Sequence, residues 1–379
     1  MSNQVKLRKE EEELISITNN SFLKPYLEDK DITDISFNGT DLRVQHNKKG
    51  RFIPAEQPQE NEVKSLAKRL ADHSNKGFNN SKPILDLAYG NLRMNFVGDI
   101  VSPYGTTLAA RSSRPALAID DLTSITNEKV AILLDLLVKS EVGIAICGRT
   151  GTGKTEVLKK LMGSTDDSKK ICLIEDTMDS HLKTLYPNKD INSYRVLLDK
   201  DRPEQAKVSY MDAVETGLRN NPDYLMISEI RNGDATEGLL EAALTDHAVM
   251  TSLHASEASG IVSRMISLYK TVRDKDEVLL GKDIVKNIPI GIHMVCEEKK
   301  GYVRYLKELV EFTGFDAEKG VQWNSIFKTR KEYDEKTQKY SKVYEYGPLS
   351  ENLLNKLKDK EIYHLLPDEF KRINLPLTA

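Results

Sequence analysis

The chain has 379 residues, of which 39% are hydrophobic and 30% charged, and its formal net charge is −3. This balance excludes a disordered or fibrous chain, and the small net charge gives no argument for nucleic-acid binding. No run of about 18 apolar residues is present, so we expect no membrane-spanning segment and at most peripheral membrane contact. The three cysteines, Cys147, Cys172 and Cys296, lack metal-ligand spacing and indicate free thiols in a reducing compartment.

Residues 1–118 have the pattern of a small α+β domain. Apolar residues spaced among charged ones predict helices over 5–24 and 62–73. Alternating apolar positions between glycine-containing turns predict strands over 32–40, 42–46, 48–53, 84–89, 92–97 and 105–111. Arg93 and Arg111 each lie in such a strand. From the pattern alone, an arginine that is solvated or paired with a carboxylate is the favoured interpretation of both.

Residues 112–115 interrupt the strand pattern and predict a hinge before a second domain, residues 119–310. Helices are expected over 127–139, 156–161, 208–218 and 237–244, alternating with apolar strands over 142–147, 170–174, 223–229 and 250–254. This alternation predicts an α/β domain with a mainly parallel sheet.

The segment between the strand 142–147 and the following helix fits the phosphate-binding pattern G-x-x-x-x-G-K-[ST]. Its glycines let successive backbone N–H groups turn toward phosphate oxygens, and the helix N-terminus adds a favourable field for negative charge. Lys154 is expected to reach the β- and γ-phosphates, and the Thr155 hydroxyl to bind Mg²⁺. The predicted nucleotide-binding residues are Gly148, Arg149, Thr150, Gly151, Thr152, Gly153, Lys154, Thr155 and Glu156.

Acidic residues end two of the expected strands, at Glu175 and Glu229. In an open α/β sheet the carboxyl ends of the strands lie on the ligand side, where a carboxylate binds metal or orients water. Each acid alone is a weak signal, because many strands end in acids without such a role. His247 and His254 bracket the strand 250–254; a structural histidine is the default interpretation, and a γ-phosphate sensor is the alternative.

Residues 311–379 form a charged and aromatic tail, and the sequence predicts strands near 302–306, 321–324 and 339–346, followed by a helix over 350–358. Interspersed lysines and tyrosines are compatible with nucleic-acid contact. Because acids are equally dense here, a β-hairpin and helix packed on the preceding domain is the favoured interpretation.

The order of these motifs resembles the secretion or traffic ATPases of type II secretion, type IV secretion, conjugation and type IV pili. The phosphate-binding loop is followed by Ile174-Glu-Asp-Thr, by Leu218-Arg-Asn-Asn-Pro-Asp-Tyr-Leu-Met-Ile-Ser-Glu-Ile-Arg231 and by Thr245-Asp-His-Ala-Val-Met-Thr-Ser-Leu-His-Ala255. These correspond to the Walker A, Asp, Walker B and His boxes of that family. The resemblance covers roughly residues 20–300.

The resemblance implies a RecA-like P-loop domain preceded by a smaller PAS-like α+β domain, with ATP held between them. On this mapping Arg93 and Arg111 reach the phosphates, and Glu229 is the general base. Glu175 lies near Mg²⁺ and His254 belongs to the His box. The implied catalytic residues are Glu229, Glu175, Lys154, His254, Arg93 and Arg111, and the implied Mg²⁺ ligands, partly through water, are Thr155, Glu175 and Glu229.

The resemblance also implies a hexameric ATP hydrolase that lies in the cytoplasm, at the inner face of the membrane, and works with inner-membrane components of a transport machine. Asp246 stands where the family usually has glycine, so the local backbone is expected to differ. Too few cysteines are present for the family's zinc module, which points to the compact type IV secretion or tight-adherence branch. A RecA-type nucleic-acid translocase and a nucleotide-gated scaffold without turnover remain the alternatives, and direct nucleic-acid contact is left open.

Overall fold

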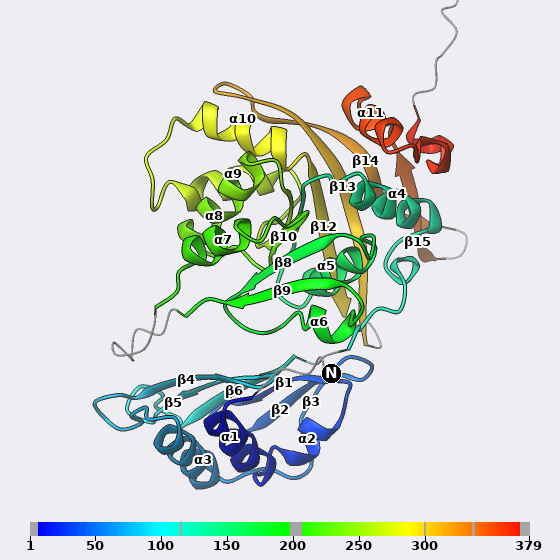
Figure 1. The fold of residues 1–379 in the computed structure, drawn as a ribbon. Coiled ribbons are helices and arrows are strands. Elements are labelled where there is room, and N and C mark those ends of the chain that lie inside the picture. The colour runs from blue at the N-terminus through cyan, green and yellow to red at the C-terminus, as the bar shows by residue number, and fades with distance from the viewer. Residues whose placement is uncertain (1–6, 114–115, 198–206, 299–300, 336–337, 372–379) are drawn as a thin grey trace, which may run out of the picture.

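The computed structural model of the chain describes residues 7–113, 116–197, 207–298, 301–335 and 338–371. These residues build two sheets, one in the N-terminal part and one in the remainder of the chain (Figure 1). Among them, no helix has the length and apolarity that a bilayer crossing requires.

Six antiparallel strands form the N-terminal sheet in the order β3-β2-β1-β6-β5-β4. Three helices cover one face of this sheet, and its other face is turned toward the second sheet (Figure 1). The helix predicted over 5–24 ends at Asn19, and a second helix begins at Lys24 with Pro25 in its first turn. The bounds are α1 Lys9–Asn19, α2 Lys24–Glu28, β1 Ile32–Phe37, β2 Leu42–His46, β3 Gly50–Phe52, α3 Glu60–His73, β4 Ile84–Tyr89, β5 Leu92–Val97 and β6 Thr107–Ser112.

The second sheet has nine strands in the order β15-β14-β13-β12-β7-β11-β10-β8-β9. Six strands that are consecutive in the sheet, β9, β8, β10, β11, β7 and β12, run parallel to one another. The neighbours β12, β13, β14 and β15 pair antiparallel. This arrangement confirms the predicted α/β class. The strand bounds are β7 Ile144–Cys147, β8 Lys170–Glu175, β9 Asp190–Arg195, β10 Tyr224–Ile227, β11 Ala248–Leu253, β12 Ile290–Glu298, β13 Tyr302–Asp316, β14 Gly320–Asp334 and β15 Lys339–Tyr346.

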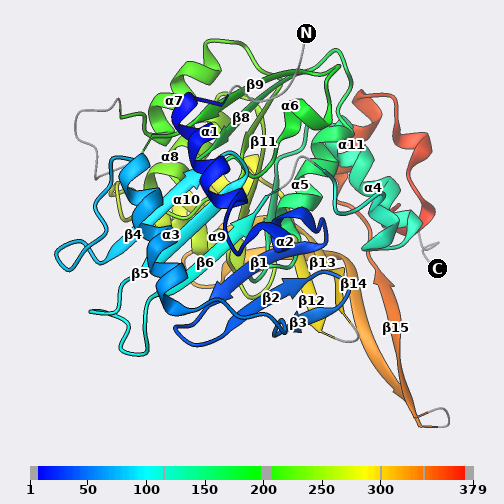
Figure 2. The same ribbon diagram turned by 90° about the horizontal axis from the view of Figure 1, so that it is seen from below.

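Helices cover both faces of the nine-stranded sheet (Figures 1 and 2). One core cluster joins the sheet to α4, α5 and α11 through residues such as Leu133, Leu158 and Leu353. The other joins it to α7, α8, α9 and α10 through residues such as Val214 and Leu239. The bounds are α4 Glu128–Lys139, α5 Lys154–Gly163, α6 Leu182–Leu185, α7 Tyr210–Leu218, α8 Gly233–Leu244, α9 Gly260–Tyr269, α10 Glu277–Asn287 and α11 Glu351–Asp359.

The last part of the chain is continuous with the second sheet. Residue 310, predicted as a boundary, lies inside β13, and β14 and β15 extend the same sheet at its edge. Figure 2 shows the far ends of β14 and β15 projecting from the body of the molecule. The division of the chain near residues 118 and 310 stays a prediction, and positions 114 and 115 of the predicted hinge lie outside the described residues.

Candidate functional site

The phosphate-binding loop, residues 148–155, connects the buried strand β7 to α5 as predicted. Gly148 has a φ of +147°, and a Cβ at this position would lie 2.4 Å from the Met294 carbonyl oxygen, so only glycine fits against β12. Gly153 has a φ of +90° and directly precedes the first turn of α5. The loop therefore turns its backbone toward the N-terminus of a ten-residue helix, which favours anions.

The Lys154 ammonium lies within the curve of this loop. Its Nζ donates to the carbonyl oxygens of Gly148, at 3.0 Å, and of Arg149, at 3.3 Å, and the residue is buried. Burial lowers the pKa of Lys154; the nearby Glu229 carboxylate opposes this shift, and the Arg111 guanidinium adds to it. An anion in the loop would offset the burial of this charge, so the residues present fit a phosphate.

Glu229 and His254 lie beside the phosphate-binding loop, residues 148–155, which we call the P-loop. They follow the ends of the neighbouring strands β10 and β11. His254 Nδ1 lies 3.1 Å from the Gly148 carbonyl oxygen, and its Nε2 lies 2.9 Å from Glu229 Oε1. Although that distance is short, the angles do not form a hydrogen bond, and the buried Oε1 has no hydrogen-bond partner. Among the described residues this oxygen is therefore a buried acceptor without a hydrogen bond, which is uncommon for a buried polar atom.

Arg231 holds the other oxygen of Glu229. Its two terminal nitrogens donate to Glu229 Oε2 at 2.7 Å and to Asp176 Oδ2 at 3.0 Å. Burial alone would raise the pKa of Glu229, but the hydrogen bond and charge of Arg231, with the charge of Lys154, lower it below the ordinary value. Glu229 is thus an ionised carboxylate at neutral pH, which suits a group that orients water.

Glu175, the last residue of β8, is 2% exposed. Its Oε1 accepts hydrogen bonds from the backbone N–H of Ser180, at 3.0 Å, and from the Ser180 hydroxyl, at 2.6 Å. Burial raises the pKa of Glu175 to about 7, and the Ser180 bonds only partly oppose that shift. The two acids of the site therefore differ, because Glu229 is ionised and Glu175 is poised near neutral pH.

Arg93 and Arg111 lie directly opposite each other on β5 and β6. Both are exposed, whereas Met94 and Ala110 beside them are buried under the helices, so the two arginines lie on the face turned toward the second sheet. Like charges directly opposite each other destabilise a sheet. Such a pair is readily explained if it faces an anion.

Both arginines influence Asp179, an acid in the loop after β8. Burial raises the pKa of Asp179, and the guanidinium groups of Arg111 and Arg93 act in the opposite direction, so all three charges share one region. The Ser113 hydroxyl also donates to the Asp179 carbonyl oxygen at 2.8 Å. Arg111 has a second carboxylate, Asp34, at 3.8 Å.

Other predicted residues lie around the loop. Arg149 and Thr150 are exposed, Gly151 and Thr155 are partly exposed, and Thr152 is buried with its hydroxyl on the Arg149 carbonyl. Glu156 instead accepts from Lys159 Nζ and from the Ala118 backbone N–H, both at 2.7 Å.

His247 contacts the Thr245 hydroxyl. Asp246 has a left-handed φ of +67°, a conformation that favours glycine. The backbone here therefore has a conformation that glycine would also adopt, although Asp246 led us to expect a different one.

The sequence interpretation missed two contributors to the site. Ser180 contacts the predicted Glu175, and this contact depends on the fold of the loop after β8. Arg304 on β13 donates to the Gly151 carbonyl oxygen at 2.8 Å, although 153 positions separate the two residues. No local pattern signals such a contact.

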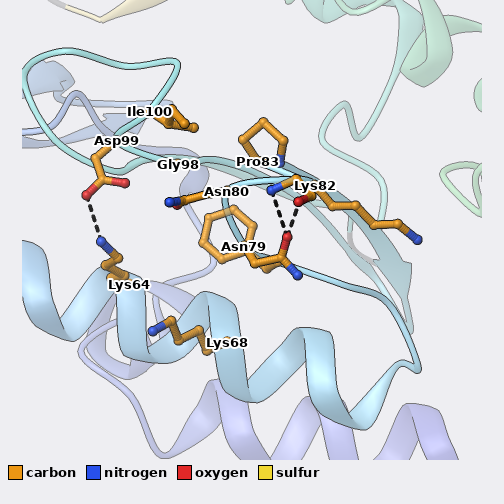
Figure 3. A pocket seen from close by; sticks show the side chains of 11 residues that line it. Lys64, Lys68, Asn79, Asn80, Lys82, Pro83, Gly98, Asp99 and Ile100 are labelled. Atoms are coloured by element: carbon orange, nitrogen blue, oxygen red, sulfur yellow. Dashed lines mark hydrogen bonds and ion pairs between the residues drawn. The ribbon is translucent and has the colours of Figure 1, made fainter.

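A second concavity lies away from these residues, in the N-terminal part. It has a volume of about 540 Å³ and lies between α3 and the segments around residues 78–83 and 98–100 (Figure 3). Its acid, Asp99, is 2.7 Å from Lys64 Nζ. None of its lining residues belongs to the P-loop or to the acids described above, so its size does not make it the nucleotide site.

Comparison with known proteins agrees with this geometry. Residues 89–278 match the family described as "Type II/IV secretion system protein". An uncharacterized protein of Bacillus anthracis is 30% identical over 351 residues, which are 89% of this chain and 75% of the relative. The VirB11 protein of the Bartonella quintana type IV secretion system is 28% identical over 182 residues, 47% of this chain and 49% of that protein. An uncharacterized protein of Methanocaldococcus jannaschii is matched over 54% of its length.

Two solved structures share the fold. The Legionella pneumophila ATPase DotB has a TM-score of 0.54 at 18% identity, over 80% of each chain. The pilus retraction motor PilT with bound ADP has a TM-score of 0.51 at 17% identity, over 92% of this chain and 89% of that chain. The predicted fold, a RecA-like α/β part preceded by a smaller N-terminal α+β part, is confirmed. The chain belongs to the type II/IV secretion system protein family, within the secretion ATPase superfamily.

Proposed function

We propose that the chain is a Mg²⁺-dependent ATP hydrolase that acts as the motor of a bacterial secretion, conjugation or pilus apparatus. The observation that carries the proposal is the exposed pair Arg93 and Arg111, directly opposite each other on the sheet face that is turned toward the second sheet (Figure 1). A P-loop needs no such pair in order to bind a nucleotide. A second domain that grips the terminal phosphate does need one.

In the proposed reaction the loop amides and Lys154 bind the phosphates of ATP. Glu229 orients the attacking water, while Arg231 holds the carboxylate in place through its hydrogen bond to Oε2. The Mg²⁺ ligands would be Thr155, Glu175 and Glu229, partly through water, and the bound ion would neutralise developing phosphate charge. Because Glu229 has a lowered pKa, its main role is to position water rather than to store a proton.

Movement follows from the arginine pair. Arg93 and Arg111 bind the γ-phosphate, so its loss after hydrolysis releases the N-terminal domain from the P-loop. In the proposed assembly six copies form a ring at the cytoplasmic face of the membrane, where inner-membrane components receive this movement. The three cysteines, too few for a zinc module, support the compact type IV secretion or tight-adherence branch.

The test measures the rate of ATP hydrolysis by the full chain at several protein concentrations. The mass of the particles is measured at the same concentrations, so that the rate can be compared with the oligomeric state. We expect Lys154→Ala to lower turnover by at least about 100-fold. Lys282→Ala, which changes an exposed lysine on α10, serves as the matched control. Equal turnover in the two variants would contradict the proposal. Strong stimulation by DNA at moderate salt would favour the translocase alternative, and ATP-dependent assembly without phosphate release would favour a scaffold.

A further inference from the structure

One side chain joins the P-loop to the N-terminal domain. Arg304 lies near the start of β13, and its Nε donates to the Gly151 carbonyl oxygen at 2.8 Å. Its Nη2 donates to the Asn47 side-chain oxygen at 3.3 Å, and Asn47 lies in the turn between β2 and β3. A single half-buried guanidinium therefore contacts both of the parts that would grip a nucleotide.

The backbone around this contact is closely fitted. The Tyr302 N–H donates to the Asn47 carbonyl oxygen at 3.3 Å, while the Asn47 N–H donates to the Asp31 carbonyl oxygen at 2.8 Å. Gly301 has a φ of +138°, and a Cβ there would lie 2.8 Å from the Lys48 carbonyl oxygen. The β2–β3 turn and the start of β13 therefore contact each other through backbone atoms as well as through the Arg304 side chain.

The other end of the contact is the apex of the P-loop. Gly151 has a φ of +79°, and a Cβ there would meet no atom within 4 Å, so side-chain packing does not hold this position. The C=O and N–H of one trans peptide point in opposite directions. An arginine that holds the Gly151 carbonyl therefore also fixes the direction of the Thr152 N–H, which in this structure donates to the Arg149 carbonyl oxygen at 3.4 Å.

We propose that Arg304 is a positioning residue that couples occupancy of the P-loop to the order of the β2–β3 turn, an inference that rests on nucleotide binding at the loop as proposed above. A nucleotide that fixes the loop apex fixes Arg304, and Arg304 then holds Asn47 and its turn. Coupling is reciprocal, so a change at the turn also alters the affinity of the loop for nucleotide. The N-terminal domain would sense the nucleotide through this link in addition to the arginine pair.

Asn47→Ala separates coupling from a merely structural role. It removes the hydrogen bond from Arg304, but the Asn47 backbone contacts and the Arg304 contact with Gly151 remain possible. Lys48→Ala is the matched control, because Lys48 lies in the same turn and its side chain pairs with Asp31 at 2.7 Å. Arg304→Ala removes both contacts at once.

The measurement is amide hydrogen–deuterium exchange of the full chain with and without ADP, together with the Kd for ADP. In the wild type and in Lys48→Ala, ADP is expected to slow exchange both in the P-loop and in residues 46–50, by about fivefold or more in the turn. In Asn47→Ala the slowing should persist in the P-loop and be lost in the turn. Arg304→Ala should also raise the Kd for ADP by about tenfold.

The outcomes separate this inference from the proposed function. If ADP slows exchange in the P-loop but protects the turn equally in the wild type and in Asn47→Ala, the coupling through Arg304 is wrong and the ATPase proposal stands. If ADP protects nothing in the wild-type P-loop, nucleotide binding there is wrong, and the coupling falls with it.

Discussion

Glu229 and Glu175 lie in one site with opposite electrostatic surroundings. Glu229 is held ionised by Arg231, whereas Glu175 is buried with only Ser180 bonded to its Oε1. In the proposed reaction this contrast would separate a carboxylate that orients water from one whose charge depends on pH and on a bound cation. Each acid therefore has its own test.

Glu229→Gln should bind ATP and hydrolyse it slowly. Glutamine keeps the volume and can still accept from Arg231, but it lacks the charge that orients water, so we expect turnover to fall by about 100-fold or more. The Kd for ATP, measured separately, should change by less than about tenfold. Full turnover in this variant would show that the role assigned to Glu229 is wrong.

Glu175→Gln should stabilise the chain at high pH. The folded-state pKa of about 7 lies above the ordinary value of 4.5, so the wild type loses stability as pH rises between these values and bears the full penalty above them. Glutamine cannot ionise and can still accept from Ser180. Urea unfolding at pH 8 should show a gain of up to about 3 kcal/mol, which should vanish near pH 4.5.

Exposed Glu215 on α7 provides the comparison, because Glu215→Gln should have no such pH-dependent effect. If Glu175→Gln and Glu215→Gln behaved alike between pH 4.5 and pH 8, burial of an ionisable Glu175 would be contradicted.

At the scale of the elements, the sequence predicts the strands and helices whose periodicity is local, whereas β9, β12, α9 and α10 lie where no strand or helix is predicted. The P-loop and the acids at the strand ends could be predicted from the sequence for the same reason, since each lies beside the strand that positions it. The sequence does not predict the contacts of Arg304 with Gly151 and of Arg231 with Asp176, because these contacts depend on which strands become neighbours in the sheet. Even β13, predicted as a short strand near 302–306, extends to Asp316, since its pairing with β12 and β14 continues there.

The β14–β15 hairpin should be stabilising at its base and nearly neutral near its tip. Phe327 is fully buried, with its ring centre 5.6 Å from those of Tyr344 and Tyr346, whereas Tyr340 is 71% exposed. We expect Phe327→Ala to lower the free energy of unfolding by about 3–5 kcal/mol and Tyr340→Ala by less than about 1 kcal/mol. Urea unfolding measures both, and equal losses would contradict the packing described for the hairpin.

At the scale of the whole molecule, the two sheets meet where the proposed reaction takes place. The P-loop, Glu229 and Asp179 come from the second sheet, while Arg93 and Arg111 come from the first. In the proposed mechanism, a site shared in this way would convert the presence of one phosphate group into the relative position of two domains. The proposed motor mechanism therefore depends on whether Arg93 and Arg111 bind the γ-phosphate.

The most direct test compares the affinities of the full chain for a non-hydrolysable ATP analogue and for ADP. Arg93→Ala and Arg111→Ala should each reduce the preference for the triphosphate by about tenfold, because a charge-assisted hydrogen bond to the γ-phosphate is lost. Arg69→Ala, an exposed change on α3, should leave the preference intact. An unchanged preference in both Arg93→Ala and Arg111→Ala would contradict the claim that ATP is gripped between the two domains.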